Sequence, residues 1–474
     1  MSSFALSPTF NKNKVFILQR SELEKRFDPF YYVPALVELE KKFLDRKPKK
    51  LRDYVVSIAS GATPKTTESE LYYTGKENGI PFLRVQNLSS TGVLEFDDCK
   101  YINKETHEGY LKRSQVFEND LLVKITGVGR MAVASVAPAN FEGNINQHIC
   151  VIRTGSKEIS KTLAAFLNSD IGEKLASRRS TGGTRPALDY PALLSIPVVY
   201  DKHILQITGK VVEQKKQNDA AAEKLLASID DYLLKELGIT MPALPENILK
   251  NRIYKTSIKE ISGGRFDPFY HQKKFSDNIQ AIIKGKYPAK PLREIVSGNP
   301  VKGSLPKQEE KDGENYVVQI NSINADGTIS FDDLLRAKNI FSKGQKLKQG
   351  DVLIVITGAT IGKISFWNYE GDYYLGGDIV KFQTNSFADN SFVFHFLRST
   401  LCQIEIKRNI TGATNGHLAP EDVKHMLIPV PPIDKQNEIA EHITVIRKQA
   451  QTLKDRTKEA LKKASEEIEE ILLN

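Results

Sequence analysis

The stretch Arg26-Phe27-Asp28-Pro29-Phe30-Tyr31 recurs unchanged in the second half of the chain as Arg265-Phe266-Asp267-Pro268-Phe269-Tyr270. Four shorter matches follow in the same order: Asp120–Gly127 with Asp351–Gly358, Phe166-Leu167 with Phe396-Leu397, Ser180–Thr184 with Ile410–Thr414, and Ile196–Val198 with Ile428–Val430. Ordered matches of this kind indicate an internal repeat. The stretches between them differ, as two recognition modules for different targets require, although gene duplication followed by drift would leave the same pattern.

A long helix is expected at the end of each half. Residues 434–474 contain no Pro or Gly, and their apolar or small residues alternate steps of four and three, the spacing of a coiled-coil seam: Ile439, Ile443, Ile446, Ala450, Leu453, Thr457, Ala460 and Ala464. Such a helix is about 60 Å long at about 1.5 Å per residue.

The corresponding helix in the first half is predicted over residues 201–237, where Gln214 and Asn218 interrupt the stripe. Gly238, Pro242 and Pro245 then end the helix. The members of the predicted stripe are Ile204, Ile207, Val211, Ala221, Leu225, Ile229 and Tyr232. A single apolar stripe needs a partner, so we expect the two helices to pack as an antiparallel pair; the alternative is that each folds back on its own domain.

The remaining parts, roughly 27–200 and 266–432, contain short β-rich runs bounded by Gly and Asn, which predict strands mixed with short helices. The expected fold is therefore α+β, with two repeated mixed α/β domains and two long antiparallel coiled-coil helices. The predicted boundaries are residues 1–200 and 241–432 for the two repeated domains, and 201–240 and 433–474 for the two long helices.

Composition narrows the class of partner. The 474 residues carry a formal net charge of +9, which favours a polyanionic partner because Lys and Arg displace counterions from phosphates. No apolar run approaches the roughly 18 residues of a membrane span, and the N-terminus lacks the apolar core of a signal peptide, so a cytoplasmic location is expected. Cys99, Cys150 and Cys402 are too few and too far apart for a zinc cluster or a disulfide framework, so we expect buried free thiols and no metal.

Three stretches imitate catalytic motifs and lack essential parts. Asp28–Tyr31 resembles the acidic-Pro-Pro-aromatic loop of amino-methyltransferases, but the second proline is missing. Gly358–Ser365 has three residues between its glycines where a phosphate loop needs four. Glu405-Ile406-Lys407 resembles part of a nuclease carboxylate set but is typical of a solvated helix face. No catalytic residue is predicted.

Recognition of a DNA sequence needs Arg, Lys, Asn and Gln at base edges, with hydroxyls and further cations on phosphates. Both Thr-Gly turns offer phosphate contacts, with an ordinary basic turn as the alternative: Arg178, Arg179, Thr181, Thr184 and Arg185, and in the second half Lys407, Arg408, Thr411, Thr414 and Asn415. The earlier Thr-Gly pairs add Lys124, Thr126 and Arg130, with Thr357 and Lys363. The base-edge candidates differ between the halves, and bonds that close a local turn are the alternative role for these side chains: Arg84, Gln86 and Asn87, with Gln319 and Asn321.

The chain resembles the specificity subunits of type I restriction-modification systems. The resemblance rests on five doubled features: the Arg-Phe-Asp-Pro-Phe-Tyr opening, the strand ending in Ile-Thr-Gly, the Thr-Gly turn, the Ile-Pro-Val exit and the long helix. The resemblance covers nearly the whole chain. It implies that each recognition domain binds one part of a split DNA site, with the part-sites about one helical turn, roughly 34 Å, apart. The paired helices would then serve as a spacer and as a docking surface for methyltransferase subunits.

The resemblance also implies the partners, namely double-stranded DNA, two methyltransferase subunits and the endonuclease-translocase subunits of the full complex, and it implies no membrane. It places no catalysis and no cofactor on this chain, with S-adenosylmethionine held by the methyltransferase subunits. Two other functions stay open from the residues: a self-sufficient DNA-modifying enzyme with fused recognition domains, and a coiled-coil adaptor without a DNA role.

Overall fold

The computed structural model describes residues 10–24, 26–243, 265–305, 313–332, 334–338, 343–412 and 416–473, together with 248, 253, 255 and 257. The chain divides into two compact units. The first unit is described over residues 10–219 and 454–473, and the second unit lies between residues 220 and 453. No helix among the described residues is long and apolar enough to cross a membrane.

The first unit is built around two sheets. One sheet has the strand order β2-β9-β6-β7 and is antiparallel, and the other has the order β4-β3-β8-β5 with β3 and β8 parallel. A short pair, β1-β10, joins the beginning and end of the domain. The strand bounds are β1 Lys49–Lys50, β2 Ser57–Ser60, β3 Ile80–Leu83, β4 Lys100–Ile102, β5 Gln115–Phe117, β6 Leu121–Lys124, β7 Ala134–Val136, β8 Glu142–Ile145, β9 Ile149–Arg153 and β10 Pro197–Val198.

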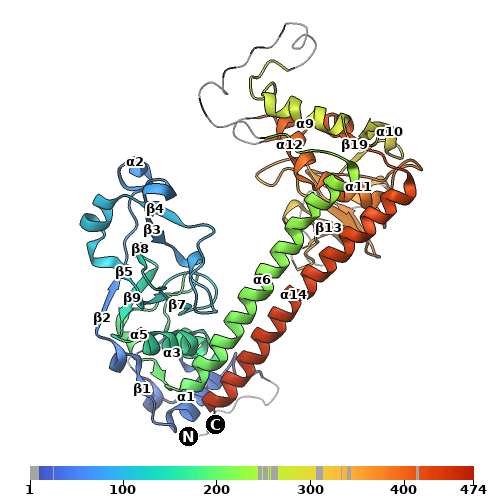
Figure 1. The fold of residues 1–474 in the computed structure, drawn as a ribbon. Coiled ribbons are helices and arrows are strands. Elements are labelled where there is room, and N and C mark those ends of the chain that lie inside the picture. The colour runs from blue at the N-terminus through green and yellow to red at the C-terminus, as the bar shows by residue number, and fades with distance from the viewer. Residues whose placement is uncertain are drawn as a thin grey trace. The chain divides into compact units, whose positions relative to one another are not determined.

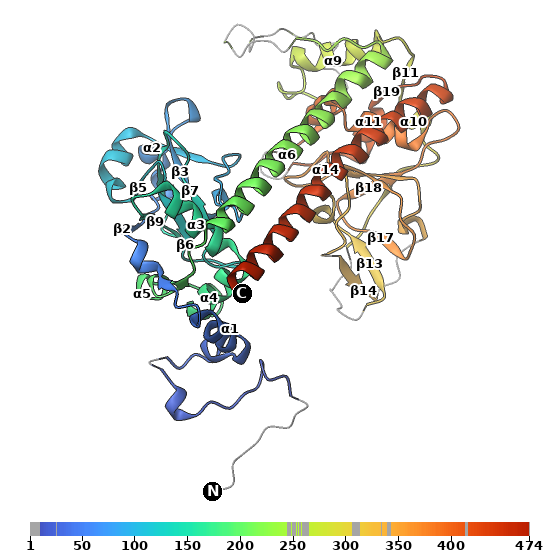
Figure 2. The ribbon, with the colours of Figure 1, turned by 60° about the horizontal axis from the view of Figure 1, so that its bottom comes forward.

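Helices cover one face of the β2-β9-β6-β7 sheet, and α3 lies beside β7 in both views (Figures 1 and 2). The helix bounds are α1 Pro34–Leu44, α2 Ser69–Tyr72, α3 Lys157–Asn168, α4 Asp170–Arg179 and α5 Tyr190–Leu194. Side chains alternate along β6: Leu121 and Val123 pack toward the helices, while Leu122 packs toward the second sheet. Because both faces are covered, residues 121–123 of the strand form an unbroken apolar run.

The second unit repeats this arrangement. Its sheet β12-β18-β15-β16 has the same order as β2-β9-β6-β7, and β13 pairs in parallel with β17 as β3 does with β8. Val352 and Ile354 of β15 pack toward the helices, while Leu353 and Val355 pack toward the other sheet. The strand bounds are β11 Ala289–Pro291, β12 Val301–Lys302, β13 Asn315–Val318, β14 Leu335–Ala337, β15 Asp351–Val355, β16 Ile364–Trp367, β17 Tyr373–Leu375, β18 Ile379–Phe382 and β19 Leu427–Pro429.

Helices α9, α11, α12 and α13 of the second unit have the same order relative to the strands as α1, α3, α4 and α5 of the first, and α9 packs on α12 (Figure 1). The helix bounds are α9 Lys273–Ile283, α10 Leu292–Ile295, α11 Asn390–Leu397, α12 Thr400–Asn409 and α13 Pro420–His425. The two units therefore share the strand order of the helix-covered sheet and the order of these helices, while the other sheet has four strands in the first unit and three among the described residues of the second. The predicted internal repeat and α+β class are confirmed.

Each unit also contains a stretch of both long helices, α6 (Lys202–Leu237) and α14 (Ile433–Leu473), which lie antiparallel. In the first unit, Ile204 shares a core with Leu472, and the amide of Asn218 donates to the hydroxyl of Thr457 at 3.0 Å. In the second unit, Lys435 Nζ lies 2.7 Å from a carboxylate oxygen of Glu236. The predicted antiparallel pair is confirmed.

Two details of the predicted helical stripe differ from the structure. Ala222 is buried where the stripe named Ala221, which is exposed. Asn218 does not interrupt the seam but lies in it, because its partner Thr457 satisfies the amide. A polar pair of this kind fixes the register of two helices at some cost in stability.

Candidate nucleic-acid interface

The Thr-Gly turn of the first unit follows α4 and is closed by a pair of backbone hydrogen bonds between Thr181 and Ala187, both 2.8 Å. Gly182 has φ +94°, a conformation that favours glycine, and a Cβ there would lie 3.0 Å from the carbonyl oxygen of Arg185. Residues 181–185 are all exposed. The turn therefore presents the hydroxyl of Thr184 and the guanidinium of Arg185 to solvent on a fixed backbone.

The second unit builds the same turn. Thr411 and His417 exchange two backbone hydrogen bonds of 2.8 Å, and Gly412 has φ +91°. Lys407 is exposed on the last turn of α12, before this loop. The predicted residues Thr414 and Asn415 lie outside the described residues. Thr357 joins the turn through its hydroxyl, which lies 3.2 Å from Nδ1 of His417.

Two of the predicted phosphate contacts are instead buried. Arg178 and Arg179 are 6% and 7% exposed, and both guanidinium groups pair with the carboxylate of Glu40. Arg179 also donates to Ser195 Oγ at 3.0 Å. These arginines hold α1 against α4, and we correct their predicted role to a structural one because both guanidinium groups are buried and paired within the unit.

Arg408 of the second unit is bound in the same way as Arg178. Its Nε donates to the carbonyl of Tyr270 at 3.1 Å, as Arg178 Nε does to the carbonyl of Tyr31 at 2.8 Å. Arg408 also lies over the ring of Tyr270, with 3.9 Å between the guanidinium carbon and the ring centroid. We therefore assign Arg408 to the support of the turn.

Backbone hydrogen bonds bring several strand ends of the first unit to one edge. After β3 and β8, Asn146 N donates to the carbonyl of Leu83 at 3.0 Å. After β6, Ile125 N donates to His148 at 2.9 Å and Leu188 N donates to Ile125 at 2.8 Å. The base-edge candidates after β3, the pair Thr126-Gly127 and the Thr-Gly turn therefore lie along one continuous edge.

The second unit has the equivalent edge. Gly376 N donates to Val318 at 2.9 Å, Ile356 N to Asp378 at 2.9 Å, and Leu418 N to Ile356 at 2.8 Å. The order of segments is the one found in the first unit. Because the connections are made by backbone groups, the side chains along the edge are free to differ.

The base-edge candidates of the first unit differ in how strongly their side chains are bound within the unit. Asn87 is buried, its side-chain oxygen accepts from Arg84 N at 2.8 Å, and its amide donates to Glu95 O at 2.9 Å, so it closes a local turn. Arg84 forms an ion pair with Asp98 at 3.0 Å, and Gln86 donates to the same carboxylate at 2.9 Å. Those two bonds lower the pKa of Asp98. Gln86 is exposed, and Arg84 is half-buried beside it.

The base-edge candidates of the second unit are less constrained. Gln319 begins a short turn in which its backbone N donates to Ser322 Oγ at 3.3 Å. Asn321 is exposed at the tip of this turn. Lys363, predicted to contact DNA, instead donates to the carbonyl of Ile323 at 2.9 Å and thereby supports the turn from behind.

Comparison with known proteins finds relatives of this chain in one family. A family model described as the type I restriction modification DNA specificity domain matches residues 284–463. The type I restriction enzyme EcoBI specificity subunit of Escherichia coli is 22% identical over 444 residues, covering 89% of this chain and 83% of that protein. The EcoKI specificity subunit of Escherichia coli K12 is 23% identical over 164 residues, covering 33% and 35%. The S subunit of a type I system from M. genitalium aligns with a TM-score of 0.42 and 13% identity, covering 90% of this chain and 94% of that one.

This chain belongs to the family of type I restriction-modification specificity subunits. A specificity subunit is the DNA target-recognition part of its complex and has no catalytic activity of its own.

Two further predicted residues of this specificity subunit, Lys124 and Thr126, are bound at the end of β6. Lys124 is 4% exposed and its Nζ donates to the carbonyls of Val128 at 2.7 Å and Arg130 at 3.0 Å, while burial lowers its pKa. Thr126 forms a β-bridge with Ala187. Lys124 and Thr126 are thus held inside the edge, behind the exposed turn.

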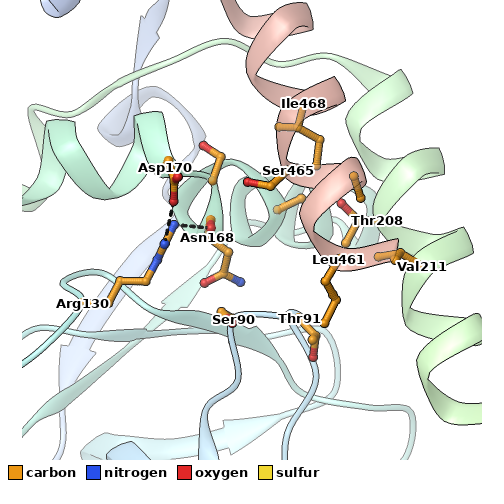
Figure 3. Close-up of a pocket in the computed structure, with 13 residues that line it drawn as sticks. Ser90, Thr91, Arg130, Asn168, Asp170, Thr208, Val211, Leu461, Ser465 and Ile468 are labelled. Atoms are coloured by element: carbon orange, nitrogen blue, oxygen red, sulfur yellow. Dashed lines mark hydrogen bonds and ion pairs between the residues drawn. The ribbon is translucent and has the colours of Figure 1, made fainter. Parts of the chain in front are cut away.

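Arg130 is likewise paired within the specificity subunit. Figure 3 shows its guanidinium directed at Asp170 and at the carbonyl of Asn168, beside a pocket of about 190 Å³ that Thr208 of α6 and Leu461 of α14 also line. The bond to Asp170 is 2.8 Å long and lowers the pKa of that carboxyl. Arg130 therefore joins the β6 loop to the corner between α3 and α4.

Sequence reasoning missed the segment between β8 and β9 of the specificity subunit. Gln147 is exposed there, and its side-chain oxygen accepts a hydrogen bond from Thr63, which is exposed too. His148 follows, between the base-edge candidates and Thr126. An Asn-Gln-His run directly between two buried strands was the available signal, because polar residues at strand ends gather at sheet edges.

Proposed function

We propose that each unit of this specificity subunit binds one part of a bipartite DNA site through the edge described above. The observation that carries the proposal is that the same backbone connections build the edge in both units, while the side chains on it differ: Arg84, Gln86 and Gln147 in one, Gln319 and Asn321 in the other. A constant frame with variable base-edge groups suits two different target sequences.

The phosphate contacts we propose are the exposed groups of the Thr-Gly turns, which are Thr181, Thr184 and Arg185 in the first unit and Lys407 and Thr411 in the second. Thr414 and Asn415 remain predicted members of the second set. Thr126 and Thr357 support these turns from the end of the neighbouring strand.

The partners we propose are two methyltransferase subunits, which hold S-adenosylmethionine, and the endonuclease-translocase subunits of a full type I complex. The paired helices α6 and α14 are the proposed spacer between the two recognition domains, residues 1–200 and 241–432. Because genomic DNA is the substrate, we expect the complex in the cytoplasm.

A domain exchange tests the modular part of this proposal. Residues 1–200 are replaced by the first recognition domain of another specificity subunit, and the complex reconstituted with its methyltransferase subunits is used to methylate genomic DNA. Sequencing of methylated sites should show one part of the site changed and the other part retained. A change in both parts would contradict independent recognition by the two units.

A point variant tests the phosphate contact. Arg185→Ala should weaken duplex binding by the full chain nearly equally for all sequences and should lower the slope of log K against log[salt] by about 1. Lys210→Ala, which removes an exposed cation of α6 in the same unit, is the matched control and should leave the slope unchanged. Equal slopes for both variants and the unmodified chain would exclude Arg185 from the interface.

A further inference from the structure

The repeated Arg-Phe-Asp-Pro-Phe-Tyr motif forms a braced turn in the first unit. Arg26 Nε pairs with Asp28 at 2.8 Å, and Asp28 accepts the backbone N–H of Tyr31 at 3.2 Å. The remaining guanidinium nitrogens of Arg26 donate to the carbonyls of Arg179 at 2.8 Å and Ser180 at 2.9 Å. The motif is thereby fixed to the end of α4, where the Thr-Gly turn begins.

The second unit repeats these bonds. Arg265 Nε pairs with Asp267 at 2.7 Å, and Asp267 accepts the N–H of Tyr270 at 3.0 Å. Arg265 also donates to the carbonyls of Asn409 at 3.1 Å and Ile410 at 3.3 Å, at the end of α12. Identical bonds to equivalent carbonyls give both copies the same conformation.

The tyrosine of each motif is clamped between cations. The ring of Tyr31 has Arg26 at 4.6 Å and Arg178 at 4.1 Å from its centroid, and Tyr270 is held by Arg408 at 3.9 Å. Tyr31 is 8% exposed. The tyrosine is thus part of the frame, and the two phenylalanines of each motif are left outside it.

Those phenylalanines are unusually exposed. Phe27 is 85% exposed and Phe266 is 79% exposed, the two largest values among the large hydrophobic side chains of the described residues. Phe30 and Phe269, later in each motif, are 52% and 44% exposed, and the ring of Phe269 also packs on Phe275. Phe27 and Phe266 are therefore the side chains that each motif holds in place with little of their apolar surface buried within the chain.

We propose that the two motifs are equivalent docking anchors, each inserting its phenylalanines into an apolar pocket on one copy of the same protein partner. This inference rests on the proposed function and assigns the partner as the methyltransferase subunit. Because the motif is identical in both units while the base-edge groups differ, the partner it binds is the same at both and independent of the DNA target. Two anchors therefore bind two copies.

The charges favour a protein over DNA as the occupant. Each motif's arginine and aspartate are paired with one another, so the exposed surface is neutral benzyl and gains nothing from counterion release. The cleft beside the first motif is lined by equal numbers of acidic and basic side chains, Glu24, Glu40 and Asp189 against Arg26, Lys50 and Arg179, so it has no excess of positive charge to attract phosphates. Since Arg26 is bonded to the start of the Thr-Gly turn, a partner on the motif would lie next to the DNA bound by that turn.

Three variants of the full chain test the proposal: Phe27→Ser, Phe266→Ser and the double variant. Each is mixed with the methyltransferase subunit of the same system, and the copies bound are counted by light scattering after size exclusion. We expect two copies for the unmodified chain, one for either single variant and none for the double variant at concentrations that saturate the unmodified chain. An anchor residue of this kind is worth about 30-fold or more in Kd at its site.

Val56→Ser is the matched control, because Val56 is 76% exposed in the first unit and lies outside the motif. It should leave two copies bound. Phe27→Leu should restore much of the binding lost in Phe27→Ser, and thermal melts should show all variants folded, since substitutions of exposed side chains usually change stability little.

Two results would overturn the inference. Two copies bound to the double variant would remove the motif from the interface. Retained stoichiometry with weaker duplex binding by the chain alone would show that the phenylalanines contact DNA. Both differ from a failure of the proposed function, in which the unmodified chain would bind neither the duplex nor the methyltransferase subunit.

Discussion

Replacing Arg179 by methionine separates a structural role from a DNA-binding role. The Arg179 side chain is 9% exposed and shares the 11% exposed carboxylate of Glu40 with Arg178. Arg179 also donates to the carbonyl of Leu175 at 3.0 Å. Methionine keeps the apolar stem and removes only the charge and its donors, so the loss reports the buried ion pair.

The expected cost follows from this geometry. Removing one partner of a buried ion pair costs about 3–5 kcal/mol, because the remaining charge is buried without its partner. Since Arg178 still pairs with Glu40, we take the lower end, about 3 kcal/mol. For a unit of this size that lowers the thermal midpoint by about 6–12 °C.

The assay is calorimetry of the full chain combined with duplex binding well below the midpoint. Arg185→Met is the matched control, since Arg185 is exposed on the adjoining turn. It should leave the midpoint unchanged and weaken duplex binding. If Arg179→Met instead kept the unmodified midpoint and weakened duplex binding as Arg185→Met does, the structural role of Arg179 would be refuted.

Three further outcomes are expected. Burial raises the pKa of Glu405 to about 7, above the ordinary 4.5 of the unfolded chain. The stability of the second unit should therefore fall as pH rises from about 4.5 to 7. Glu405→Gln should remove this pH dependence in urea unfolding measured across that range. Gly327→Ala should lower the free energy of unfolding more than Gly358→Ala does in the same measurement. Both glycines have positive φ, near +84°. A Cβ at Gly327 would lie 1.6 Å from Arg398 Nη1, whereas a Cβ at Gly358 meets no atom within 4 Å among the described residues. Asn218→Ala should destabilise the helix pair by about 1 kcal/mol, seen as faster amide exchange in the adjoining turns of α6; unchanged exchange would mean that its hydrogen bond contributes nothing.

The architecture was predictable because its signals are local or periodic. The matched strands β6 and β15 contain the apolar runs 121–123 and 352–355 because both faces are covered, and such runs can be recognised in the sequence without knowledge of their neighbours. The long helices show the spacing of a seam over many turns, so single errors such as Ala221 for Ala222 did not change the prediction. The order of strands within a sheet has no such local signal, and it was not predicted.

The site was predictable only in part, because burial of a polar side chain depends on partners far along the chain. Arg178 and Arg179 end a helix before a Thr-Gly turn, as phosphate-binding residues would, yet their partner Glu40 lies 138 and 139 residues earlier. Glu405 was expected on a solvated helix face and is 5% exposed, because α12 is covered by α9. The sequence pattern around these residues carries no trace of either contact.

The positions of the cations decide how much of the net charge of +9 is available for DNA binding. Lys124 and Lys363 donate to backbone carbonyls behind the edge. In the second unit Arg398 and Arg447 both donate to the carbonyl of Asp326, in the loop that follows Asn321. Such cations stiffen the loops that carry base-edge groups, because a charged donor holds a carbonyl more strongly than a neutral one. Part of the positive charge of this subunit therefore serves the rigidity of the proposed recognition edge and is not available for attraction to phosphates.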